Sequence, residues 1–293
     1  MTLDQAAASS ALPRLHFAHA NGFPIASYRQ FLTPLRQQYR LSTTDFIGHH
    51  PDYPVTDNWH LLCAHLIHDI EQLGEPVIGV GHSLGGGLMF MASHQRPDLF
   101  QGAIMLDVPL MTPWEARILS VLKRTPWGDR VTPAGRAARR RSQWPSQQAA
   151  FDYLHEKPLF RRFPATVLWD YIHAVTEPIP HDGNPDSVQD AAWTLRYRPE
   201  VEAEIFRTFP THLTRHYRDY HPSLQVIRGA ETDVVKAHHV SLMRDRLGIP
   251  VHDWPGGHLF PLEQPTGSAE RLHDLIQQQL APAAEKALQH AHA

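Results

Sequence analysis

Cysteine, long apolar runs and net charge are all scarce in this chain. Its 293 residues include one cysteine, Cys63, which excludes an internal disulfide and any multi-cysteine zinc site. No run approaches the ~20 apolar residues that span a bilayer. The formal net charge is −3, which is not the charge of a chain built to bind nucleic acid. We therefore expect neither a membrane span nor a nucleic-acid partner.

A secretory signal is also missing from the start of the chain. Residues 1–12 lack the basic and apolar regions of a signal peptide. A single cysteine fits a reducing compartment, so we expect a cytoplasmic protein. With 42% hydrophobic and 19% charged residues, the composition is that of an ordinary globular enzyme and not of a disordered chain.

Histidine, by contrast, is abundant. The 22 histidines are scattered, and pairs such as His49–His50 and His238–His239 follow no metal-ligand spacing. A zinc site needs three or four converging donors, so surface or core positions are favoured for these residues. The sequence predicts no metal and no other cofactor.

Short apolar runs alternate with helical patterns at both ends of the chain. The runs expected to form strands lie at 15–18, 39–47, 77–80, 103–106, 224–227 and 251–254. Helical spacing covers 57–73, 84–95, 235–247 and 268–288. Strands that alternate with helices indicate βαβ units and a mostly parallel sheet. The chain is therefore predicted to have an α/β core.

The interval between these two halves has a different character. Residues 109–222 hold most of the tryptophans and show helical patterns. They predict a helical cap inserted into a core formed by 13–108 and 223–293. Within the cap, 117–141 is rich in Lys and Arg. A solvated helix face is favoured for this run, with an entrance for anionic substrates or a membrane surface as alternatives.

The segment Gly81-His82-Ser83-Leu84-Gly85 carries the strongest chemical signal. A G-x-S-x-G pattern arises by chance in roughly one sequence in ten of this length, since glycine is about 7% of residues. Here an apolar run precedes it and a helix follows. A serine on such a sharp strand-to-helix turn exposes its hydroxyl above the sheet. Ser83 is therefore the predicted nucleophile.

A serine nucleophile needs a base, and the base needs a carboxylate to orient it. His258 lies in a glycine-rich loop after the last expected strand, from which it can reach the carboxyl edge of the sheet. Asp233 follows the preceding strand and gives the chain order Ser, Asp, His. Asp107, at the end of the strand beside the elbow, is the alternative acid.

A tetrahedral intermediate also needs hydrogen-bond donors aimed at its oxyanion. The backbone N–H of Leu84 lies directly after the nucleophile, at the start of a helix. The second donor is expected from the turn Asn21-Gly22-Phe23-Pro24 after the first strand, where Phe23 is favoured.

These segments together resemble the α/β-hydrolase superfamily, in particular its capped, esterase-like members. The turn at 21–24 is similar to their His-Gly-x-Pro oxyanion turn, and 45–49 to their Asp-x-x-Gly-His loop. Residues 81–85 resemble their nucleophile elbow, and Gly257-His258 their histidine loop. The resemblance covers about 14–108 and 224–290; the insertion matches only in position and helical character.

Two departures from the family pattern matter. Asn21 stands where the oxyanion turn usually has histidine, so Asn21 is an alternative second donor. Few residues precede the first expected strand, so the two leading strands common in this fold are expected to be missing and the sheet to have about six strands. A serine nucleophile also argues against the chemistry of dehalogenases and epoxide hydrolases, which use aspartate.

The resemblance implies a serine hydrolase that cleaves an ester-type bond of a small, mostly apolar substrate through an acyl-enzyme, as a monomer or homodimer. The same triad also serves thioesterases, carbon–carbon hydrolases and perhydrolases. A non-catalytic ligand-binding protein on the same scaffold is the other alternative. A nucleotide-binding turn at 79–85 is disfavoured, because its glycine spacing and its place on the third strand are wrong for that role.

Overall fold

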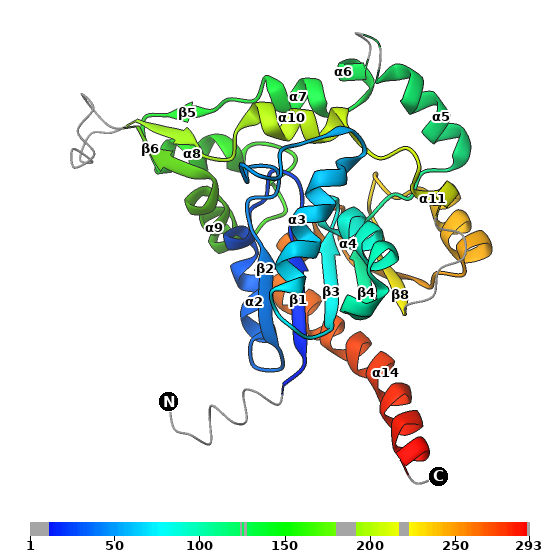
Figure 1. Cartoon of the computed structure of the whole chain (residues 1–293). Coiled ribbons are helices and arrows are strands. Elements are labelled where there is room, and N and C mark those ends of the chain that lie inside the picture. Colours follow the sequence, from blue (N-terminus) through cyan, green and yellow to red (C-terminus); the bar gives the residue numbers. More distant parts are fainter. Residues whose placement is uncertain (1–11, 124, 126–127, 180–191, 217–222, 292–293) are drawn as a thin grey trace.

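A six-stranded parallel sheet lies at the centre of the computed structural model, which describes residues 12–123, 125, 128–179, 192–216 and 223–291 (Figure 1). The strands, in chain order, are β1 (Arg14–Ala18), β2 (Arg40–Thr44), β3 (Val77–His82), β4 (Phe100–Leu106), β8 (Leu224–Gly229) and β9 (Val251–Trp254). They are arranged in the order β2-β1-β3-β4-β8-β9, and all neighbours pair in parallel. The predicted parallel α/β sheet of six strands is confirmed.

The side chains of each strand alternate between two hydrophobic layers, as the period of a strand requires. On β4, Ile104 and Leu106 point into one layer, whereas Ala103 and Met105 point into the other. Every residue of β3 is buried, because both of its faces are covered. This explains why β3 reads as a continuous apolar run in the sequence.

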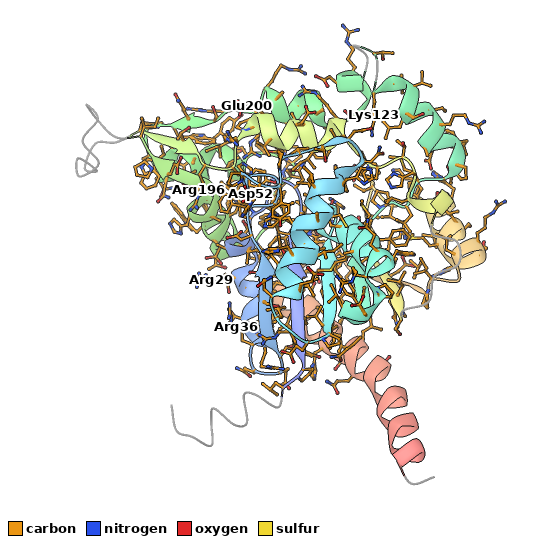
Figure 2. All side chains as sticks on the ribbon, viewed as in Figure 1. Arg29, Arg36, Asp52, Lys123, Arg196 and Glu200 are labelled. Carbon is orange, nitrogen blue, oxygen red and sulfur yellow. The ribbon has the colours of Figure 1, made fainter. Side chains whose placement is uncertain are left out.

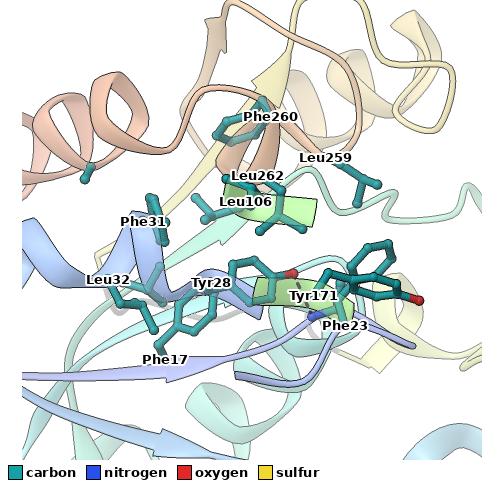
Figure 3. Close-up of a cluster of buried hydrophobic side chains, with 14 of the residues drawn as sticks. Phe17, Phe23, Tyr28, Phe31, Leu32, Leu106, Tyr171, Leu259, Phe260 and Leu262 are labelled. Atoms are coloured by element: carbon teal, nitrogen blue, oxygen red, sulfur yellow. Dashed lines mark hydrogen bonds between the residues drawn. The ribbon is translucent and has the colours of Figure 1, made fainter. Parts of the chain in front are cut away.

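Helices cover both faces of the sheet. One layer is closed by α2 (Arg29–Leu35) and α14 (Pro265–Ala291), and the other by α3 (His60–Glu71) and α4 (Leu84–Gln95). Figure 3 shows part of the first layer, where Phe31 and Leu32 lie near Phe260 and Leu262. The remaining helical turns of the core are η1 (Ile25–Tyr28), η2 (Asp57–Trp59), η3 (Pro97–Leu99), α12 (Ala237–Ser241), the π-helical turn η5 (Leu242–Arg246) and α13 (Phe260–Glu263). Among the described residues, no helix has the length and apolar character needed to cross a bilayer.

The segment between β4 and β8, residues 107–223, lies over one end of the core (Figure 1); we call it the intervening segment. Its helices are α5 (Pro113–Leu122), α6 (Gly128–Val131), α7 (Ala134–Ala138), α8 (Gln147–His155), α9 (Ala165–Val175), α10 (Pro199–Arg207) and α11 (Leu213–His216). It also contains a small antiparallel sheet of β5 (Gln143–Trp144), β6 (Thr176–Pro178) and β7 (Trp193–Leu195), in the order β5-β7-β6. The sequence did not predict these strands, since runs this short show no alternation.

The basic run 117–141 does not form a single surface. Lys123, labelled in Figure 2, pairs with Asp57 of the core at 2.9 Å, and Arg140 is largely buried. Arg139 is exposed, and Arg141 places its guanidinium over the rings of nearby aromatic residues. Arg124 lies outside the described residues. The exposed members fit the solvated face that the sequence favours.

Candidate active site

A strained turn joins β3 to α4. Ser83 has φ 51° and ψ −110°, a backbone conformation that side-chain-bearing residues rarely adopt. A Cβ atom on Gly81 would lie 2.3 Å from the backbone of Gly85, and one on Gly85 would lie 2.2 Å from the carbonyl oxygen of Ala18. Both glycines are therefore required by close backbone contact, and the turn lifts Ser83 above the carboxyl end of β3.

Three polar side chains meet above this turn. His258 Nε2 lies 3.1 Å from Ser83 Oγ, and His258 Nδ1 lies 2.7 Å from Asp107 Oδ2. A carboxylate accepts hydrogen bonds, so Nδ1 carries the hydrogen and Nε2 is left to accept the Ser83 hydroxyl. The arrangement is that of a nucleophile, a base and an orienting acid in series.

Asp107 is fully buried, and its carboxylate accepts several hydrogen bonds. Its Oδ1 accepts the backbone N–H of Gly229 at 2.8 Å, and its Oδ2 also accepts the hydroxyl of Thr232 at 2.6 Å. With His258, three donors surround a carboxylate that has no access to water. A buried charge needs such partners, and they hold the carboxylate at one place and in one orientation.

The expected contact between Asp233 and His258 is not formed. The loop after β8 first pairs with β9, where Ala230 N–H donates to Trp254 O at 2.7 Å, and then makes a tight turn in which Thr232 N–H donates to Gly229 O at 3.1 Å. This turn directs Thr232 inward and leaves Asp233 exposed. Asp107, the alternative acid, takes the place that the sequence assigned to Asp233.

One signal in the sequence could have favoured Asp107. It follows directly on β4, and the elbow directly follows the neighbouring strand β3. Adjacent parallel strands end side by side, so a carboxylate one residue beyond β4 lies beside the nucleophile. Asp233 is four residues beyond its strand, a distance over which the direction of a loop is not set by the sheet.

The expected oxyanion donors differ in whether they already donate a hydrogen bond within the protein. The N–H of Leu84 is among the first N–H groups of α4, which have no partner within the helix. The N–H of Phe23 donates to Ala20 O at 3.0 Å in this structure. The amide of Asn21 donates to the backbone oxygen of Glu202 at 2.9 Å, so this side chain fastens the intervening segment.

Aromatic side chains from the intervening segment cover the turn that contains Phe23. The Phe23 ring lies 5.0 Å from Tyr171, 6.1 Å from Phe160 and 6.3 Å from Phe163, measured between centroids. Figure 3 shows Phe23 and Tyr171 side by side, with Leu259 of the histidine loop on the same side. The surroundings of the turn on this side are therefore mostly apolar.

A charged pair from the intervening segment lies against the same turn. Arg140 pairs with Glu202, and it also donates to the Tyr171 hydroxyl at 3.3 Å. A Cβ atom on Gly22 would lie 3.1 Å from the carboxyl carbon of Glu202, a tight contact, and the φ of 80° at Gly22 is one that other residues rarely adopt. Burial raises the pKa of Glu202, while Arg140 opposes that shift.

One group of side chains has donors spaced as in a metal site. Glu115 of α5 and His238 and His239 of α12 bring their ligand atoms within 4.8 Å of one another. However, His239 Nδ1 accepts the N–H of Lys236 at 3.1 Å, so its proton is on Nε2, which faces Glu115. A metal needs that nitrogen deprotonated. The cluster therefore fits hydrogen bonds between α5 and α12 better than a metal ion.

Comparisons with known proteins identify the family and the fold. A model of the alpha/beta hydrolase family matches residues 17–271. No curated protein matches the chain in sequence. Among solved structures, E-2-(acetamidomethylene)succinate hydrolase is similar with a TM-score of 0.70 and 20% identity, covering 91% of this chain and 92% of that one.

Two further solved structures show the same fold. The peroxisomal alpha-beta-hydrolase Lpx1 from Saccharomyces cerevisiae has a TM-score of 0.68 and 14% identity, with 92% of this chain and 79% of that one covered. The enol-lactonase from Burkholderia xenovorans has a TM-score of 0.57 and 14% identity, with coverage of 91% and 92%. At these identities the likeness concerns the fold.

Proposed function

Because the chain belongs to the alpha/beta hydrolase family, we propose that it is a serine hydrolase that cleaves an ester-type bond of a small, mostly apolar substrate. The observation that carries this proposal is the series Ser83, His258 and Asp107, with contacts of 3.1 Å and 2.7 Å. The exposed position of Asp233 supports Asp107 as the acid.

In the proposed reaction, Ser83 Oγ attacks the carbonyl carbon while His258 Nε2 takes the hydroxyl proton. The resulting oxyanion accepts the N–H of Leu84. For Phe23 to serve as the second donor, its N–H must share or leave its bond to Ala20 O. His258 then returns the proton to the leaving alcohol oxygen, and an acyl group remains on Ser83.

The second half of the reaction repeats these steps with water. His258 takes a proton from a water molecule, whose oxygen attacks the acyl carbon, and the second tetrahedral intermediate releases the acid product. Ser83 recovers its proton from His258. Asp107 keeps its negative charge throughout, holding the ring in the working tautomer and stabilising the imidazolium form.

We further propose that residues 109–222, which make up nearly all of the intervening segment, form a cap that shapes the substrate site. The rings of Phe160, Phe163 and Tyr171 around Phe23 favour an acyl or aryl group of apolar character. Proteins of similar fold include a hydrolase, a thioesterase domain and an enol-lactonase. Because these three proteins are named for different types of bond, the activity should be tested with both oxygen esters and thioesters.

The proposal is tested with two measurements on the purified protein. A fluorophosphonate probe should label the wild type and not the Ser83→Ala variant, because only an activated serine reacts. Nitrophenyl esters of graded chain length, with acyl-CoA thioesters alongside, should then reveal turnover with a preference for short or aryl groups. A folded wild type that neither takes up the probe nor hydrolyses any ester would favour a non-catalytic ligand-binding protein.

A further inference from the structure

A buried histidine that the proposed chemistry does not use lies directly before the nucleophile. His82 is the last residue of β3 and has no exposed surface. Its Nε2 lies 2.8 Å from the backbone oxygen of His258, and its Nδ1 lies 2.6 Å from the hydroxyl of Tyr28. The ring thus connects two segments that are far apart in the sequence.

The partners of this ring determine where its proton is. A backbone carbonyl only accepts hydrogen bonds, so His82 Nε2 carries the hydrogen and donates it to His258 O. Complete burial lowers the pKa of His82 to about 3, and the ring is neutral near pH 7. Nδ1 therefore accepts the Tyr28 hydroxyl, whose oxygen accepts the N–H of Ala20 at 3.2 Å.

The result is a continuous series of hydrogen bonds in one direction, from Ala20 through Tyr28 and His82 to His258. Each bond in such a series polarises the next and strengthens it. No donor or acceptor on the His82 ring is left without a partner. Neutral partners of this kind suit a buried position better than a charged pair, which would have to overcome desolvation.

These bonds join the three segments that surround the nucleophile. Ala20 accepts the N–H of Phe23 and so closes the turn after β1. His82 adjoins Ser83 on the elbow. His258 is held twice, by its backbone oxygen through His82 and by its ring Nδ1 through Asp107. The position of its Nε2 relative to Ser83 Oγ depends on both restraints.

We propose that His82 is a positioning residue that keeps His258 within hydrogen-bonding distance of Ser83 by holding its backbone carbonyl; this inference rests on the proposed function. His82 itself touches neither the substrate nor Ser83 Oγ in this role. A shift of about 1 Å in a reacting group costs about 10²-fold in rate. Loss of the tether should therefore reduce turnover and leave substrate binding nearly unchanged.

Two substitutions by amide side chains test the two ring nitrogens of His82 separately. The side-chain nitrogen of a glutamine reaches the position of an imidazole Nε2, whereas an asparagine reaches only that of Nδ1. His82→Gln keeps a donor for His258 O, and we expect kcat within a few-fold of wild type. His82→Asn keeps a partner for Tyr28 and loses the donor, and we expect kcat to fall about 10- to 100-fold with KM nearly unchanged.

Melting temperatures and hydrogen exchange of the amides at 256–260 complete the test. We expect the two variants to melt alike, and the histidine loop to exchange faster in His82→Asn than in His82→Gln. Equal kcat in the two variants, or a loss that simply follows their melting temperatures, would overturn the proposal and leave His82 as a packing residue.

The exchange measurement does not depend on catalysis. If the wild type neither reacts with a fluorophosphonate nor hydrolyses esters, the proposed function fails on its own. Faster exchange at 256–260 in His82→Asn alone would then still support the tether. Equal exchange in both variants would overturn it.

Discussion

The loops around Ser83 and the intervening segment above them are held by different kinds of interaction. Around the elbow, the backbone makes the contacts: Ser83 N–H donates to Leu106 O at 2.9 Å, and Asp107 N–H donates to Ile227 O at 2.7 Å. These bonds continue the ladders of the parallel sheet beyond the strand ends. They depend on the path of the main chain and tolerate many side chains.

The intervening segment, in contrast, is fastened mainly by side chains. Arg29 of α2, labelled in Figure 2, donates to Asp170 of α9 at 2.8 Å. Other pairs between this segment and the core are Arg162 with Glu231 and Glu263, Asn21 with the backbone of Glu202, and Glu115 with His238 and His239. Most of these contacts need two matching side chains, so they are specific to one sequence.

For the proposed function, this difference predicts that the chemistry and the choice of substrate depend on different parts of the chain. Backbone bonds of this kind do not depend on side-chain identity, and proteins that share 20% identity or less have the same fold. Side-chain pairs change readily, so a segment that they hold can vary without disturbing the contacts among Ser83, His258 and Asp107. Changes at the elbow should therefore act on turnover, and changes in the intervening segment on stability and specificity.

The largest effect is expected at the nucleophile. Ser83→Ala should lower kcat by at least about 10⁴-fold, and adding His258→Ala should cost little more, because triad members act as a unit. The melting temperature should stay within a few degrees, since the hydroxyl contributes nothing to the core. Ester hydrolysis and thermal unfolding of the single and double variants measure both quantities. If the Ser83→Ala variant kept nearly wild-type activity, Ser83 could not be the nucleophile.

The two carboxylates should differ sharply. Asp107→Asn should lower kcat by about 10⁴-fold, because an amide at this position favours the wrong tautomer of the His258 ring. In that tautomer Nε2 carries the hydrogen and cannot take the proton of Ser83. Asp233→Asn is the matched control from the neighbouring loop, and it should change kcat less than about twofold because an exposed carboxylate orients nothing. Steady-state kinetics on one ester rank the two. A larger loss of kcat in Asp233→Asn than in Asp107→Asn would indicate Asp233 as the acid.

Within the intervening segment, the buried pair should affect stability more than chemistry. Arg140→Met leaves Glu202 buried without its partner and should lower the free energy of unfolding by about 2–3 kcal/mol. Arg139→Met, at the exposed neighbour, should change it by less than about 0.5 kcal/mol. Denaturant unfolding measures both. Equal stability of the two variants would show that the pair does not hold the segment.

The smallest effect is expected where α5 meets α12. Glu115→Gln should cost about 1 kcal/mol at pH 7, the typical value of a helix-capping contact. Burial alone would raise the pKa of Glu115, but hydrogen bonds from Thr112 and the two histidines outweigh it and lower the pKa from 4.5 to about 2.

A carboxyl whose pKa is lower in the folded chain stabilises that chain above its unfolded pKa. The contribution of Glu115 should therefore be present above about pH 4.5 and decline as the pH falls toward 2. Denaturant unfolding of wild type and Glu115→Gln between pH 7 and pH 3.5 should show the difference shrinking at the acid end. Glu270→Gln, on the exposed face of α14, is the control for removal of a glutamate charge. A constant difference at every pH would assign the effect to packing.

The turn that carries Ser83, the proposed nucleophile, could be predicted from the sequence because its environment is local. Five consecutive residues specify the turn, since Gly81 and Gly85 are required by backbone contacts within the turn and against β1. The central strands β3 and β4 could be predicted for the same reason, as each is a short and mostly buried run rich in apolar residues. The small strands β5 to β7 could not, because two or three residues show no period.

What the sequence by itself determined, then, is the identity and chain order of the strongest candidates, Ser83 and His258, together with the parallel sheet that presents them. Which of the two candidate carboxylates reaches His258 became definite only in the tertiary structure. The backbone bonds of the loop after β8 turn Thr232 inward and Asp233 outward, while the ends of β3 and β4 bring Asp107 beside the elbow. Proximity between residues far apart in the chain depends on loop direction, and loop direction follows from hydrogen bonds that form only once the strands are in place.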